Sequence, residues 1–214
     1  MANHGMGRLV LVAPPAFDPD VARWMATRGR HRIDSALIVG SVADAIDALD
    51  VARVIGTTAR PRRLETPVWG PERLCEVMVG QPAPTAIVFG PEDFGLDNAS
   101  VARCDAVLRI PTAEHSSLNL SQAVQVTASS LAIAARSAPA APPQTLASAK
   151  LRRLMTDDLL EVLSATAYFS GRTLTPTRAR VTAAVARLSL DHDTVANARG
   201  MLKSVLHRLR RPAK

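Results

Sequence analysis

The chain has 214 residues, of which 47% are hydrophobic and 3% aromatic, and its formal net charge is +7. This length suits one α/β domain of ordinary size with a small accessory piece. No apolar run approaches the ~20 residues needed to span a bilayer, and the first residues lack the pattern of a signal peptide. The sequence therefore predicts no membrane role and a cytoplasmic location.

Apolar runs and helical patterns alternate along the first part of the chain. The runs are short, end at Gly, Pro or Thr, and have the composition of buried parallel strands. The segments between them can each turn an apolar face toward a sheet, and Ser41 and Asp97 are placed to cap two of them. We expect strands at 8–12, 37–39, 51–56, 86–89 and 106–110, and helices at 20–27, 42–49, 71–79, 98–103 and 120–136. This alternation predicts an α/β fold with a parallel sheet.

The composition changes after residue 136 to a run rich in Pro and Ala, which excludes regular helix. We therefore divide the chain into a sheet domain at 1–136, a linker at 137–146 and a helical bundle at 147–214. Apolar residues in the last part recur at helical spacing and predict three short helices. We expect the T-L-T-P-T segment at 173–177 to be a connecting turn and Asp193 to cap the last helix.

The two cysteines, Cys75 and Cys104, match no metal-ligand spacing and are too few for a disulfide scaffold. They fit a reducing compartment, and we interpret both as small core or near-surface residues. We therefore expect no metal site.

Three expected strands end in polar loops that lead into helix starts. The loops read G-T-T-A-R, V-F-G-P-E-D-F-G-L and I-P-T-A-E-H-S-S-L-N-L-S-Q-A-V, at 56–60, 88–96 and 110–124. Unpaired N–H groups and hydroxyls converge at such places, which are the usual ligand sites of open α/β sheets.

In order and spacing, these three segments resemble the core motifs of the SPOUT superfamily of S-adenosylmethionine-dependent RNA methyltransferases. The resemblance is to its TrmH/SpoU family and to the TrmJ-type tRNA 2'-O-ribose methyltransferases within it, and it extends from about Met1 through the C-terminal helices. It implies a deep trefoil knot in the sheet domain, a small C-terminal helical domain, and a homodimer formed through the knotted region.

The resemblance also implies S-adenosyl-L-methionine as cofactor. Gly90 has no Cβ, so a ligand can approach the backbone there, and Ile110 with Leu118 can sandwich an adenine. Taken singly, Gly56 and Gly90 are ordinary turn residues, so only the whole set supports a site. The positions that match the family's cofactor contacts are Thr57, Thr58, Ala59, Gly90, Ile110, Ser116, Ser117 and Leu118.

The implied reaction transfers the sulfonium methyl group to a ribose 2'-hydroxyl, which must be aligned and must lose its proton. Asn119 and Ser117 are the candidates for positioning that hydroxyl. Glu92 either orients neighbouring loops or interacts with a helix dipole. Arg60 is either a phosphate contact or a solvated surface arginine.

The basic residues are clustered, which favours an RNA partner or, alternatively, a merely solubilising surface. With so few aromatic residues, RNA binding should depend on phosphate contacts and shape. The clusters are Arg23, Arg28, Arg30, His31 and Arg32; Arg60, Arg62 and Arg63, which we take as the RNA-binding set; and Arg199, Lys203, Arg208, Arg210, Arg211 and Lys214.

One family motif is absent. TrmJ-like proteins carry a first strand and an N-x-G-A-x-A-R-A-M segment with catalytic Asn and Arg, and the opening M-A-N-H-G-M-G-R aligns with the family sequence just after its arginine. Asn3 is not in an equivalent position. We hypothesise a truncated form that folds and binds cofactor but transfers methyl poorly, with a sheet edge or apolar face left uncovered.

The leading functional interpretation is a tRNA 2'-O-methyltransferase acting near position 32 of the anticodon loop. The alternatives are an rRNA 2'-O-methyltransferase and a non-catalytic RNA-binding protein of the same fold. A Rossmann-type nucleotide enzyme is disfavoured, because no G-x-G-x-x-G follows the first strand and no G-x-x-x-x-G-K-[ST] is present.

Overall fold

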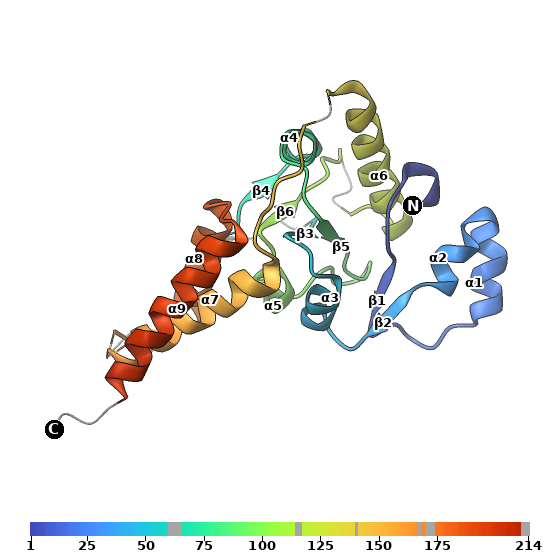
Figure 1. Cartoon of the computed structure of the whole chain (residues 1–214). Coiled ribbons are helices and arrows are strands. Elements are labelled where there is room, and N and C mark those ends of the chain that lie inside the picture. The colour runs from blue at the N-terminus through green and yellow to red at the C-terminus, as the bar shows by residue number, and fades with distance from the viewer. Residues whose placement is uncertain (60–65, 114–116, 140, 167, 170–173, 211–214) are drawn as a thin grey trace.

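The computed structural model describes residues 1–59, 66–113, 117–139, 141–166, 168–169 and 174–210 (Figure 1). Its central sheet is parallel, with strand order β4-β6-β3-β5. The strands are β3 (Arg53–Thr57), β4 (Val68–Trp69), β5 (Thr85–Val88) and β6 (Ala106–Leu108). The predicted α/β class with a parallel sheet is confirmed.

Helices cover both faces of this sheet. One face packs against α4 (Pro71–Gly80) and α6 (Leu120–Ser137), where Ile55 and Leu108 meet Leu74 and Leu131. The other face packs against α3 (Val42–Leu49) and α5 (Asn98–Val101). Neighbouring residues of one strand therefore enter different cores, as the two-residue period of a strand requires.

The two helix caps that the sequence predicts in this domain are present in the structure. The Ser41 hydroxyl accepts a hydrogen bond from the Asp44 amide at 3.1 Å and begins α3. The Asp97 carboxylate accepts one from the Ser100 amide at 2.7 Å and begins α5. Both predicted caps are confirmed, because a cap depends only on residues within one helical turn.

The first two strands differ from expectation. β1 (Val10–Val12) and β2 (Leu37–Val39) do pair in parallel, but they form a separate sheet, and the Ile38 side chain is 59% exposed. The prediction that these strands are buried is wrong. Within the described residues β1 pairs only with β2, and β5 only with β3, so each sheet has an open edge.

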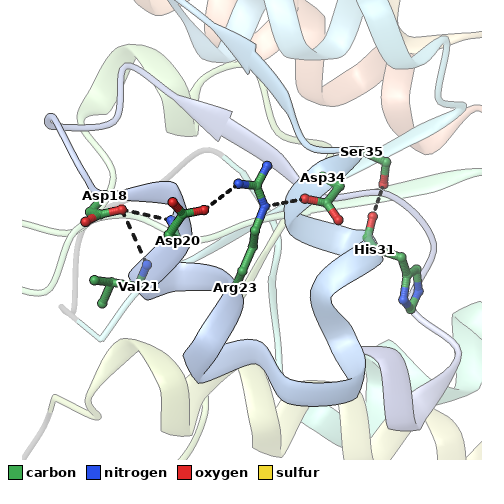
Figure 2. Close-up of polar contacts among 7 residues, drawn as sticks. All are labelled: Asp18, Asp20, Val21, Arg23, His31, Asp34 and Ser35. Carbon is green, nitrogen blue, oxygen red and sulfur yellow. Dashed lines mark hydrogen bonds and ion pairs between the residues drawn. The ribbon is translucent and has the colours of Figure 1, made fainter.

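Short helices lie before β1 and between β1 and β2, and of these only the helix at 19–26 was expected. They are η1 (Ala2–His4) before β1, then α1 (Pro19–Ala26), η2 (Thr27–Gly29) and α2 (Arg30–Asp34). Figure 2 shows how α1 and α2 are joined: Arg23 on α1 contacts Asp20 of the same helix at 2.8 Å and Asp34 on α2 at 2.7 Å. Asp18 caps α1 through the Asp20 amide at 2.8 Å.

The three predicted C-terminal helices are present as α7 (Ala149–Ala165), α8 (Leu174–Arg187) and α9 (His192–Leu209). They share a core that includes Met155, Val185 and Val195. The predicted turn at 173–177 is wrong from Leu174 onward, because those residues form the first turn of α8. Pro176 is compatible with that place, since amides in a first turn have no intrahelical acceptor. Thr173 lies outside the described residues.

The bundle is bound to the sheet domain through α7. Arg152 is 8% exposed and donates hydrogen bonds to both Asp105 oxygens, at 2.7 and 3.0 Å, and to the Ala52 carbonyl at 2.6 Å. Arg153 contacts Asp47 of α3 at 2.7 Å, and the Ala149 amide donates to the Val51 carbonyl at 2.7 Å. The division at 136 and 147 stays a prediction, since α7 takes part in both cores.

Acidic residues of α7 pair with arginines on α8, on α9 and directly after α9. Arg199 contacts Asp158 at 2.7 Å, Arg210 pairs with Glu161, and Arg178 pairs with Asp157. Two arginines of the basic C-terminal cluster, Arg199 and Arg210, are therefore paired with carboxylates of α7. No helix in the described part of the chain is long and apolar enough to cross a membrane.

The cap of α9 is Asp191 and not the predicted Asp193. The Asp191 carboxylate accepts hydrogen bonds from the Thr194 amide at 2.8 Å and the Thr194 hydroxyl at 2.9 Å. Asp193 lies inside the first turn. A sequence pattern alone locates a helix start only to within a residue or two, and this shift is of that size.

We expect Asp191→Ala to lower Tm by a few degrees, and the matched Asp193→Ala to lower it less, because only Asp191 accepts the amide hydrogen bond. The hydrogen bonds from Thr194 hold the pKa of Asp191 below its ordinary value of 3.8. The contribution of Asp191 is therefore present above that value and is lost as the pH falls through the lowered pKa. Thermal unfolding of both variants at neutral and acidic pH checks this, and equal Tm losses for the two would contradict it.

Candidate active site

A pocket of about 310 Å³ lies at the carboxyl ends of β3, β5 and β6, next to the start of α6. Carboxyl ends of parallel strands meet at one edge, so the three motif loops come together there. The lining residues are Thr57, Thr58, Ala59, Phe89, Gly90, Pro91, Glu92, Asp93, Phe94, Gly95, Leu108, Ile110, Ser117, Leu118, Leu120 and Ala123.

The structure brings together most of the residues that the sequence selected for the cofactor. Those that line the pocket are Thr57, Thr58, Ala59, Gly90, Ile110, Ser117 and Leu118. Ser116 lies outside the described residues, as do Arg60, Arg62 and Arg63, the predicted RNA contacts. Cofactor contact itself stays a prediction for all of these positions.

Hydrogen bonds fix the end of β3 between its neighbours. The Thr57 hydroxyl donates to the Val88 carbonyl of β5 at 3.2 Å, and the Thr58 amide donates to the Leu108 carbonyl of β6 at 3.0 Å. These bonds continue the sheet for one residue beyond the strand. They hold the Thr57 to Ala59 turn against the pocket.

Glycine is required at position 90 because the backbone of Gly95 and Leu96 lies very close to it. A Cβ at this position would lie 2.3 Å from both the Gly95 carbonyl carbon and the Leu96 amide nitrogen. The loop therefore folds back over the end of β5, and the Gly95 amide closes it by donating to the Pro91 carbonyl at 2.8 Å. Gly95 has φ +65°, which favours glycine. Packing is therefore one reason for glycine here, and the expectation that the missing Cβ also makes room for a ligand stays a prediction.

Close packing also explains why residue 56 is a glycine. A Cβ there would lie 2.8 Å from the Cys104 sulfur. Burial raises the pKa of the Cys104 thiol to about 12, so the thiol stays protonated and acts as a small core group. Both features agree with the interpretation of Cys104 as a core residue.

Asn119, the first candidate for positioning the ribose hydroxyl, is not among the pocket-lining residues. Its side-chain oxygen caps α6 by accepting from the Ser121 amide at 2.9 Å and the Ser121 hydroxyl at 2.7 Å. The Gln122 side chain accepts from the Asn119 amide at 3.2 Å and completes a capping box. Ser117, the other candidate, does line the pocket. The geometry therefore gives Asn119 a capping role, and its part in catalysis stays a prediction.

The rim of the pocket contains residues that sequence reasoning did not assign to it. Glu92 and Asp93 place two exposed carboxylates beside the pocket, and Phe94 places an exposed ring there. Negative charge at the rim suits a cationic ligand better than a phosphate. Phe94 could have been selected from the sequence, because it is an aromatic residue in a strand-end loop of a chain that has only four Phe, two Trp and one Tyr.

Small residues at three strand ends, a closed loop and a helix start thus surround one pocket at the carboxyl edge of a parallel sheet. This arrangement is typical of the small-molecule sites of α/β proteins. Comparison with known families narrows the class, because the model of the SpoU rRNA Methylase family matches residues 1–129. The chain belongs to this family, and the resemblance to TrmJ-like SPOUT methyltransferases is confirmed.

Several relatives are similar over the sheet domain. An uncharacterized tRNA/rRNA methyltransferase of Haemophilus influenzae is 35% identical over 135 residues, which are 63% of this chain and 55% of that protein. The tRNA (cytidine/uridine/adenosine-2'-O-)-methyltransferase TrmJ of Pseudomonas aeruginosa is 36% identical over 130 residues, which are 59% of this chain and 50% of that protein. The chain spans about half the length of these curated relatives.

A solved structure extends the likeness to the C-terminal helices. TrmJ from Z. mobilis ZM4 superposes with a TM-score of 0.77 at 28% identity, covering 96% of this chain and 89% of that one. The shared fold therefore includes the part of the chain beyond the family match.

Proposed function

We propose that this chain binds S-adenosyl-L-methionine in the strand-end pocket and transfers its methyl group to a ribose 2'-hydroxyl of tRNA. The observation that carries the proposal is the meeting of all three motif loops around one pocket in a member of the SpoU family. Relatives named as tRNA 2'-O-methyltransferases TrmJ support tRNA as the substrate class.

The residues of the pocket fit this cofactor. Its size of about 310 Å³ is at the lower end for small-molecule sites. Ile110 and Leu118 offer apolar surface for an adenine, and Glu92 offers a negative charge that suits a cationic ligand. When bound, the cofactor supplies an activated methyl group.

The chain's own residues would bind and orient the substrates. Ser117 lines the pocket and carries a hydroxyl that can hydrogen-bond the ribose 2'-hydroxyl, which must be aligned before it reacts. Asn119 supports this loop by capping α6 immediately after it. The proposal also includes phosphate contacts by Arg60, Arg62 and Arg63, a nucleotide near position 32 of the anticodon loop, and a cytoplasmic location.

The trefoil knot and the homodimer are part of the same proposal, carried by family membership. In the family both are formed by the segment that follows the third strand end, which here is the segment after Ile110. A dimer built on that segment would bring the RNA of one active site close to both subunits.

Labelled-methyl transfer to unmodified tRNA and to rRNA tests the proposal, together with calorimetric binding of S-adenosylhomocysteine. We expect binding of S-adenosylhomocysteine, and label in tRNA at a nuclease-resistant ribose linkage. Label in rRNA alone would replace tRNA as the substrate. RNA binding without S-adenosylhomocysteine binding or transfer would favour the non-catalytic alternative.

A further inference from the structure

We propose that Phe94 is a stacking platform for a base of the bound RNA at the mouth of the pocket. This inference rests on the proposed function and adds to it a residue that recognises the substrate. It also revises the expectation that RNA binding depends on phosphate contacts and shape alone.

Phe94 belongs to the pocket and yet faces solvent. It is among the lining residues, but its side chain is 71% exposed, whereas Leu96, two residues later, is 6% exposed. The ring therefore lies at the outer rim. Ile110 and Leu118 already supply apolar surface to the pocket itself. A large apolar ring left exposed beside a ligand pocket is typical of a recognition surface.

The backbone holds Phe94 in this place. The loop closes through the bond from the Gly95 amide to the Pro91 carbonyl, and it packs on Gly90 too closely to admit a Cβ. Buried Leu96 and the α5 cap at Asp97 anchor the chain directly after it. A ring on a fixed backbone loses little conformational entropy when a partner stacks on it.

The charges around Phe94 favour a base over the phosphate backbone. Glu92 precedes the ring by two residues in the same loop and is exposed. The Glu92 carboxylate repels phosphates, so RNA that reaches this rim should present its uncharged bases. Stacking on an aromatic face is the usual way in which unpaired bases are bound.

The test is the affinity of the full chain for unmodified tRNA, measured with saturating S-adenosylhomocysteine over a range of salt concentrations. We expect Phe94→Ala to weaken tRNA binding by about tenfold. The slope of log Kd against log salt should stay unchanged, because no phosphate contact is lost. Phe94→Trp should bind as tightly as the wild type or more tightly. Trp24→Ala is the matched control, since Trp24 is 76% exposed on α1 and lies outside the pocket.

Three results would overturn the inference. The first is equal tRNA affinity of Phe94→Ala and wild type. The second is an equal loss of affinity for S-adenosylhomocysteine, which would make Phe94 part of the cofactor site. The third is an equal loss in Trp24→Ala. A wild-type chain that binds tRNA through Phe94 but transfers no methyl would overturn the proposed function and support the stacking role.

Discussion

Replacing Gly90 with alanine is expected to lift the loop from the end of β5 and to destroy the ligand pocket. The new Cβ would lie 2.3 Å from two backbone atoms, of Gly95 and Leu96. Backbone cannot rotate away as a side chain can, so the loop itself must move. We expect a loss of about 3 kcal/mol in the free energy of unfolding, at the upper end of ordinary overpacking. Affinity for S-adenosylhomocysteine should fall by at least about tenfold.

Chemical denaturation and calorimetry check both parts of this expectation. The matched control is Gly200→Ala, because a Cβ at Gly200 meets nothing within 4 Å and the residue lies inside α9. That change should leave ligand binding intact and stabilise the helix by about 0.5–1 kcal/mol. A Gly90→Ala protein with wild-type stability and affinity would show that the loop does not pack on the strand end.

The second large effect is expected for Arg152→Met, which should cost about 3–5 kcal/mol of stability. The Arg152 and Asp105 side chains are only 9% and 14% exposed. Asp105 also accepts from the Val54 amide at 2.8 Å, so it cannot turn away without leaving that amide unpaired. Removing the arginine would take away the guanidinium that is hydrogen-bonded to a buried carboxylate, which would keep only its longer-range interaction with Arg53, and would free the Ala52 carbonyl.

The neighbouring Arg153→Met is the matched control. One Arg153 nitrogen donates to both Asp47 oxygens at 2.7 Å, but both side chains are about one third exposed, so the loss of this pair should cost at most about 1 kcal/mol. Urea denaturation of both variants gives the comparison. In the double variant Arg152→Met with Asp105→Asn, part of the loss should be recovered. Equal effects of Arg152→Met and Arg153→Met would contradict the buried-pair argument.

Those parts of the fold that depend on local sequence could be predicted. β3, β5 and β6 are apolar runs with β-branched residues, and Ser41 and Asp97 cap the helices they precede. β4 was missed because a pair of residues shows no periodicity, and it exists by pairing with β6. The prediction that β1 and β2 are buried was wrong, because an apolar run indicates only that a strand can be buried. The rest of the molecule decides whether anything covers it.

The candidate site likewise has features that could be predicted from local sequence and features that could not. Loops at parallel strand ends must meet, so Thr57, Gly90 and Ile110 could be placed together from sequence. Asn119 followed by Gln122 is a capping-box pattern, so the role of Asn119 as the cap of α6 could have been predicted from the sequence. The Arg152 to Asp105 pair joins residues 47 positions apart, and no local pattern indicates such a contact.

The arginine–carboxylate pairs of the C-terminal bundle weaken the long-range electric field of the chain. An arginine bound to a carboxylate acts at a distance as a dipole, whose field decays faster than that of a single charge. At physiological salt even an unpaired surface charge is screened beyond about 8 Å. Arg178, Arg199 and Arg210 therefore contribute little to long-range attraction, although each counts fully in the net charge of +7. The face that attracts a polyanion is determined by the cations without carboxylate partners, and an isoelectric point does not reveal where they are.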